Sequence, residues 1–170
     1  ICIKPGVLCE LEVAKSDEQS FSITINGSET SWPLCRYVVE SMVGKKSLSV
    51  IAKINMALPL GHGLGMSGAI AFSLSLALAR AIMNFKPRFT YFDAVEVAHS
   101  AEMQAKTGLG DVAFQSRGGI VIRRKPGIAE LAGLDRLLAE GEVVICIVGK
   151  RMDTPDIIGH PIYKSIITTE

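Results

Sequence analysis

The segment PLGHGLGMSGA, residues 59–69, decides the fold because it is a glycine-rich loop at the junction of a strand pattern and a helix pattern. Residues 47–58, SLSVIAKINMAL, alternate apolar with small polar side chains and predict a strand. Residues 66–84 are apolar on nearly all sides and predict a helix that lies between layers. Glycines at such a junction let the backbone approach a ligand closely, and the start of the helix adds partial positive charge. The segment therefore predicts a phosphate-binding loop.

The spacing of this loop excludes two common glycine motifs. A Walker A motif ends in Gly-Lys-Ser or Gly-Lys-Thr, and no lysine occurs in residues 54–85. The G-x-S-x-G elbow of hydrolases fails because Gly68 directly follows Ser67.

A dinucleotide-binding loop remains open as an alternative. Its pattern G-x-G-x-x-G is present at Gly63, Gly65 and Gly68, and Asp93 lies about where a ribose-binding acid is expected. Against it, the chain before the loop predicts antiparallel strands where a dinucleotide fold would begin with a β-α-β unit.

Apolar periodicity outside the loop predicts a mixed order of strands and helices. The first two predicted strands are expected to be antiparallel, the turn signal Asn26-Gly27 follows the second, and Thr90 is expected to cap a helix. Residues 107–111 predict a loop, and residues 151–170 predict the entry to a further element. The predicted strands cover 1–13, 20–26, 120–125 and 142–149, and the predicted helices cover 33–43, 90–106 and 128–140.

Composition narrows the classes of partner. The chain has 170 residues, with 18 Lys and Arg against 17 Asp and Glu, and a net charge of +1. This length suits one domain with its own core. Because no basic tract is present, neither nucleic acid nor a membrane surface is an expected partner. Residues 54–79 lack charged side chains, but Pro59 and the glycines interrupt them, so a buried helix is expected instead of a membrane span.

The cysteines give no sign of a metal site or a disulfide framework. They show no C-x-x-C spacing and do not cluster with the histidines, so no zinc site is expected. Scattered cysteines in apolar surroundings are typical of the reducing cytoplasm, which is the expected location. The four are Cys2, Cys9, Cys35 and Cys146.

The glycine loop resembles the second motif of the GHMP kinases, the superfamily of galactokinase, homoserine kinase, mevalonate kinase and phosphomevalonate kinase. That motif reads P-x-x-x-G-L-G-S-S-A, and Met66 and Gly68 depart from it. A second stretch, EMQAKTGLGD at residues 102–111, resembles the family segment that precedes a Gly-Gly pair, here Gly118-Gly119. The positions of the glycine loop that match the family motif are Pro59, Gly63, Leu64, Gly65, Ser67 and Ala69.

The resemblance implies an ATP-dependent kinase that uses Mg²⁺. It assigns Ser67 and Glu102 to the metal and Asp111 to the substrate hydroxyl. Phosphoryl transfer needs such a set, namely donors around the phosphates, hard oxygen ligands for magnesium and a carboxylate near the attacking group. The expected nucleotide-binding residues are Pro59, Gly61, His62, Gly63, Leu64, Gly65, Met66, Ser67 and Gly68.

Within the superfamily, GHGLGMSGA, AHSAE and TGLGDVAFQSRGGIVIRRKPG together are most similar to the archaeal pantoate kinases. This similarity implies phosphorylation of pantoate to 4-phosphopantoate in coenzyme A biosynthesis, with mevalonate, homoserine and sugar kinases as alternatives. The small hydroxy-acid substrate carries a carboxylate, for which Arg117 is the expected partner and Arg123 and Arg124 are further candidates.

The resemblance also implies the domain organisation. Residues 1–150 are expected to form an α+β domain like the second domain of ribosomal protein S5. Residues 151–170 are expected to be a linker and the start of a ferredoxin-like C-terminal domain that is largely absent. A homodimer is common among such kinases.

Overall fold

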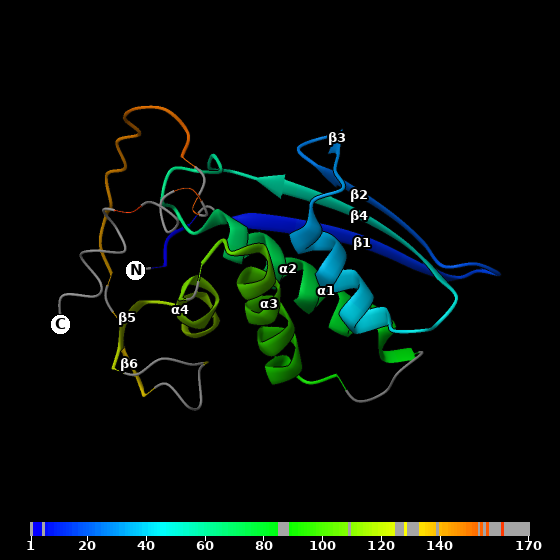
Figure 1. Cartoon of the computed structure of the whole chain (residues 1–170). Coiled ribbons are helices and arrows are strands. Elements are labelled where there is room, and N and C mark those ends of the chain that lie inside the picture. Colours follow the sequence, from blue (N-terminus) through cyan, green and yellow to red (C-terminus); the bar gives the residue numbers. More distant parts are fainter. Residues whose placement is uncertain are drawn as a thin grey trace.

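Helices pack on one face of a mixed sheet (Figure 1). The computed structural model describes residues 2–4, 6–84, 89–108, 110–124, 128, 133–138, 140–152, 154, 156 and 161. The strand order is β1-β4-β2-β3. The bounds of these strands are β1 Val7–Lys15, β2 Ser20–Ile25, β3 Ser28–Glu29 and β4 Leu48–Met56.

The first two strands are antiparallel in direction, as expected, but they are not neighbours. β4 lies between them, antiparallel to β1 and parallel to β2. It takes the centre because its inward side chains, Leu48, Val50, Ala52 and Ile54, are at most 3% exposed.

The parallel pairing of β2 and β4 corrects a second expectation. Helix α1, Pro33–Val43, connects these strands, so a β-α-β unit does precede the glycine loop. The predicted turn is confirmed, because Asn26 and Gly27 have φ angles of 47° and 80° and join β2 to β3 as a hairpin.

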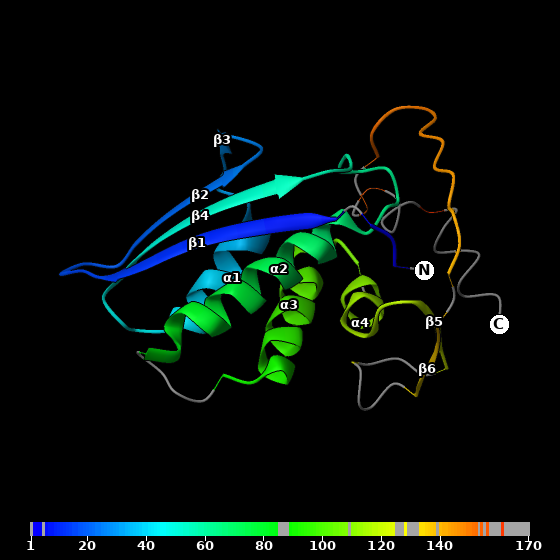
Figure 2. The ribbon, with the colours of Figure 1, turned by 180° about the vertical axis from the view of Figure 1, so that it is seen from behind.

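Helix α2, Met66–Ala81, is enclosed between the sheet and the other helices (Figure 2). A 3-10 turn, η1 Ile82–Asn84, continues it, and α3, Tyr91–Ala105, packs along it. Ile70, Leu74 and Leu78 are fully buried, which explains the absence of a polar face. The predicted helices α1, α2 and α3 are confirmed. None of the helices that the structure describes has the length and apolarity needed to cross a membrane.

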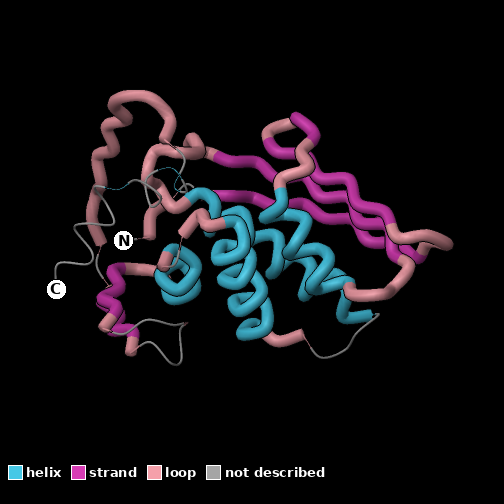
Figure 3. The backbone as a smooth tube through the Cα atoms, viewed as in Figure 1, coloured by secondary structure: helices cyan, strands magenta, loops and turns pink. Residues whose placement is uncertain are grey.

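The C-terminal third departs most from expectation (Figure 3). The sequence did not predict α4, Asp111–Arg117, which begins where the loop at 107–111 was expected to end. β5, Ile120–Arg123, is confirmed and pairs with β6, Leu134–Leu137, inside the range expected to be helical. Gly133 has a φ of 56°, which ends any helix there.

The apolar segment 142–149 does not form the expected strand. Val144 is 94% exposed and Val148 is 80% exposed, and no strand pairs with the segment in the part of the chain that the structure describes. An apolar run predicts burial in a sheet only when neighbouring strands are present. The remainder of the predicted helix 128–140 and most of 151–170 lie outside the described residues.

Candidate active site

The glycine loop connects β4 to α2 in a conformation that few residues other than glycine adopt. Gly61, Gly63 and Gly65 have φ angles of 76°, 70° and 65°. Gly65 is the N-cap of α2, and none of the side chains that the structure describes caps this helix end. The first N–H groups of α2 are therefore directed toward whatever lies at the loop, which is the arrangement that binds anions.

Ser67 and Glu102 meet beside this helix start. The Ser67 Oγ donates a hydrogen bond to Glu102 Oε1 (2.9 Å), and the Thr107 Oγ1 donates to the same oxygen (3.4 Å). Glu102 comes from α3 and is fully buried, and its Oε2 makes no hydrogen bond of good geometry to the residues that the structure describes. Burial raises the pKa of Glu102 to about 7, Asp111 adds to this, and the hydrogen bond from Ser67 opposes it. A buried carboxylate with one unsatisfied oxygen is typical of a site that receives a cation.

Asp111 brings a second carboxylate to the same place. It is the first residue of α4, and burial raises its pKa. Two glycines leave room for the pair of acids. A Cβ at Gly68 would lie 2.9 Å from the Asp111 Cβ and 3.0 Å from Glu102 Oε2, and a Cβ at Gly108 would lie 3.1 Å from Glu102 Oε1. The carboxylates of Glu102 and Asp111 therefore occupy space that a side chain at position 68 or 108 would fill.

The close contacts of Gly68 predict a steric cost for a larger residue. Ala in place of Gly within a helix usually stabilises a protein by about 1 kcal/mol. Here we expect Gly68→Ala to lower the free energy of unfolding by about 1–3 kcal/mol, because its methyl group meets the Asp111 and Glu102 side chains. Urea denaturation measures this. Gly141→Ala is the control, since a Cβ there meets nothing within 4 Å. An unchanged or increased stability of Gly68→Ala contradicts the packing.

Two cavities flank the loop. The larger, about 920 Å³, is lined by loop residues from Leu60 to Ser67 together with Trp32, Thr107 and Asp111. The smaller, about 630 Å³, is lined mainly by apolar side chains. Residues 63–66 and Asp111 line both cavities. The loop and one carboxylate thus form a wall between two spaces, each within the size range of small-molecule sites.

The structure brings most of the expected site residues together. Residues 61–67 and Asp111 line the larger cavity, and Glu102 lies buried behind Ser67. Pro59 does not line either cavity, and Gly68 packs on the carboxylates instead.

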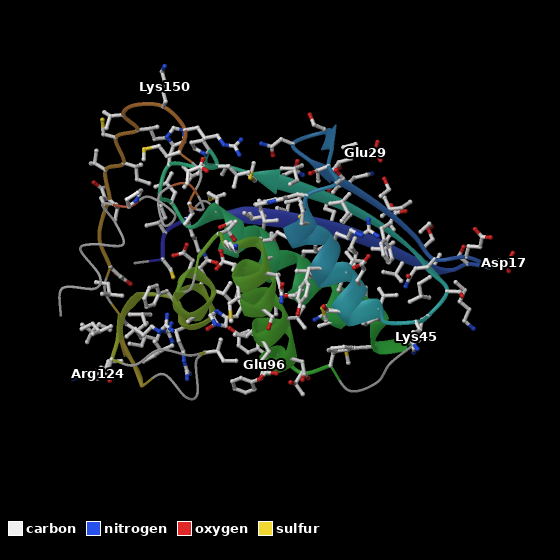
Figure 4. All side chains as sticks on the ribbon, in the orientation of Figure 1. Asp17, Glu29, Lys45, Glu96, Arg124 and Lys150 are labelled. Carbon is white, nitrogen blue, oxygen red and sulfur yellow. The ribbon has the colours of Figure 1, made fainter. Side chains whose placement is uncertain are left out.

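The three candidate arginines lie elsewhere, and none lines either cavity. Arg117 is the last residue of α4, where it lies near Tyr91. Arg124 pairs with the exposed Asp135 (2.6 Å), and Figure 4 shows it at the lower left edge of the molecule. Arg123 lies against Gly110. The structure therefore places none of the three expected arginines where it could bind a substrate carboxylate in either cavity.

Sequence reasoning missed two side chains that contact the loop. The Gln115 Nε2 donates a hydrogen bond to the Gly65 carbonyl (2.8 Å), which ties α4 to the start of α2. Gln115 follows Asp111 by one helical turn, a spacing that becomes informative only once α4 is known. Arg151 packs on Gly61 from a distant part of the chain, and no sequence pattern links the two.

Asp93, the acidic residue that the dinucleotide-binding alternative requires, does not lie at the glycine loop. The Asp93 Oδ2 accepts hydrogen bonds from the backbone N–H (2.6 Å) and the hydroxyl (2.7 Å) of Thr90, and it belongs to the capping box that begins α3. Asp93 lies nine residues before Glu102 in the same helix, or roughly 14 Å away at 1.5 Å per residue. It is therefore a helix cap at the opposite end of α3.

The donor set fits Mg²⁺. This ion prefers hard oxygen ligands and is usually held by one or two carboxylates together with phosphate oxygens and water. Ser67, Glu102 and Asp111 supply a hydroxyl and carboxylates, and within the described part of the chain Glu102 Oε2 makes no well-formed hydrogen bond. Among the residues described, no group of three or more His, Cys, Asp or Glu side chains is placed to hold a metal by itself. The site thus suits a metal that arrives with phosphate ligands.

Comparisons with known proteins agree with this geometry. Residues 34–119 match the family model described as the N-terminal domain of GHMP kinases. The chain is 34% identical over 131 residues to a pantoate kinase of Thermococcus kodakarensis, in an alignment that covers 76% of the chain and 42% of that relative. It is 42% identical over 134 residues to a pantoate kinase of Methanospirillum hungatei, covering 74% of the chain and 45% of the relative.

A solved structure is also similar. A phosphotransferase related to the coenzyme A biosynthesis pathway superposes with a TM-score of 0.73 at 30% identity, covering 81% of the chain and 46% of that structure. The chain therefore spans less than half the length of each of these three proteins.

Proposed function

The chain belongs to the GHMP kinase family, and from this premise we propose that it forms the nucleotide-binding part of a kinase that transfers the γ-phosphoryl group of ATP to a hydroxyl of pantoate. One observation carries the proposal. Ser67, Glu102 and Asp111 gather at the glycine loop, between two cavities of ligand size. The relatives named pantoate kinase support pantoate as the acceptor.

We assign ATP to the larger cavity. Its triphosphate would lie against the N–H groups of residues 61–67 and the start of α2, where the loop is open to an anion. The partly buried Trp32 lines the same cavity and offers an aromatic surface for the base.

We assign the hydroxy acid to the smaller cavity, on the other side of the loop. Val7, Leu58, Phe72 and Phe114 line it, and such a surface suits the branched hydrocarbon centre of pantoate. Asp111 lines this cavity as well. A hydroxyl bound here would face Asp111 on one side and the phosphates across the loop on the other.

Asp111 is the proposed catalytic group. Its carboxylate would accept a hydrogen bond from the attacking hydroxyl, hold that oxygen in line with the γ-phosphate, and take the proton as the bond to phosphorus forms. A pKa raised by burial makes it a better proton acceptor. Ser67 and Glu102 would hold Mg²⁺, which when bound neutralises charge on the phosphate oxygens.

The acceptor is tested by a coupled assay of ADP release with the full-length protein. Pantoate, mevalonate, homoserine and simple sugars are compared at saturating Mg-ATP. We expect kcat/KM for pantoate to exceed that for each other acceptor by at least tenfold, because the branched hydrocarbon centre of pantoate suits the apolar lining of the smaller cavity. Preference for mevalonate, homoserine or a sugar would reassign the substrate within the family. If the protein releases no ADP with any of these acceptors, the proposed activity is contradicted.

A further inference from the structure

The glycine loop leaves a problem of charge. The triphosphate of a nucleotide is strongly anionic, and phosphate-binding loops commonly contain a lysine. Residues 54–79 contain neither lysine nor arginine, and His62 is the one ionisable side chain within them. A second source of positive charge close to the loop would complement the metal.

Residues 150–152 return to the loop from the far end of the described chain. The Met152 backbone N–H donates a hydrogen bond to the Gly61 carbonyl (2.8 Å). In Figure 1 the segment that ends here, coloured orange, arches back toward the turn that follows β4. About ninety residues of sequence separate the two partners, so this contact belongs to the tertiary fold.

Arg151 lies directly on the glycine loop. A Cβ at Gly61 would overlap the Arg151 side chain, with its Cδ and Nε 3.2 Å away. Gly61 is therefore needed for this approach as well as for its positive φ of 76°. Arg151 lines the larger cavity together with residues 61–67. Lys150 also contributes to the lining, but its amino group extends outward from the molecule in Figure 4.

We infer that Arg151 binds the phosphates of the nucleotide, an inference that rests on the proposed function and assigns the nucleotide a ligand outside the glycine loop. A guanidinium group remains charged at all relevant pH values and binds phosphate oxygens through two parallel N–H donors. Its position against Gly61 places it at the loop itself, where the backbone N–H groups supply the remaining donors.

Direct titration of nucleotides by calorimetry tests this inference with the full-length protein. Arg151→Gln should weaken the binding of ATP and ADP at least tenfold and leave that of adenosine within twofold, because adenosine has no phosphate. Arg151→Lys keeps the charge and loses the paired donors, so its affinity for ATP should fall between those of Arg151→Gln and the wild type. Arg80→Gln is the matched control, since Arg80 is exposed in the last turn of α2 and remote from the loop.

The possible outcomes separate the inference from the function on which it rests. If the wild type binds ATP and Arg151→Gln binds it within twofold as tightly, Arg151 is not a phosphate ligand. An equal loss for ATP and adenosine would also overturn the inference, because it would indicate a distorted cavity. If the wild type itself does not bind ATP, the proposed function fails, whatever the variants do.

Discussion

Asp111→Asn is expected to lower kcat roughly a thousandfold, the usual contribution of a catalytic acid or base, while the Kd for ATP stays within about threefold. The substitution keeps the size of the side chain, so the packing against Gly65 and Gly68 is preserved. It removes the group that would accept the proton from the attacking hydroxyl. Because Asp111 lines both cavities, it is the carboxylate placed to contact the acceptor and the phosphates together.

Steady-state kinetics and nucleotide titration separate this role from a structural one. Asp135→Asn is the matched control, because Asp135 is exposed on β6 and pairs with Arg124. It should retain the turnover of the wild type. If Asp111→Asn turns over at the wild-type rate, Asp111 has no part in proton transfer, and if it loses ATP binding and kcat together, its role is to shape the cavity.

Glu102→Gln is expected to abolish most Mg-dependent turnover and to change how stability depends on pH. In the folded protein without metal, burial raises the pKa of Glu102 to about 7 from an ordinary value of 4.5. Between these pH values the folded chain keeps a proton that the unfolded chain has released. Stability therefore falls as pH rises through this range, by about 1.4 kcal/mol per unit and about 3 kcal/mol in total. Glu102→Gln cannot ionise, so this loss should be absent.

Urea denaturation at pH 5, 6, 7 and 8, in EDTA and without nucleotide, measures the effect. The difference in stability between the wild type and Glu102→Gln should change by about 2–3 kcal/mol between pH 5 and pH 8, in favour of the variant at high pH, because part of the total loss occurs below pH 5. Glu96→Gln is the control on the same helix, because Glu96 is exposed, and its profile should parallel that of the wild type. Parallel profiles for Glu102→Gln would show that Glu102 titrates normally and is not held in a costly buried position.

Local patterns in the sequence were sufficient to predict the glycine loop and the helices next to it. The glycines at 61, 63 and 65 combine a backbone requirement with a place between a strand and a helix, and both signals are local. Thr90 and Asp93 form the predicted helix start for the same reason, since a capping box involves residues three apart. The α+β class, which the family resemblance implied, is confirmed.

The remaining features depend on contacts between distant residues. The central place of β4 is set by the crossover through α1, and β6 is a strand because it pairs with β5. Gln115 and Arg151 reach the loop across 50 and 90 residues of sequence, and no local period predicts such approaches. The domain boundary after residue 150 stays a prediction, and so does the homodimer.

A crystal structure of the full-length protein with Mg²⁺, a non-hydrolysable ATP analogue and pantoate tests the central assignment most directly. We predict the triphosphate against residues 61–67, the metal bound by Ser67 and Glu102, and the pantoate hydroxyl within hydrogen-bonding distance of Asp111. A nucleotide bound away from the glycine loop, with Glu102 still buried and hydrogen-bonded to Ser67, would contradict the account.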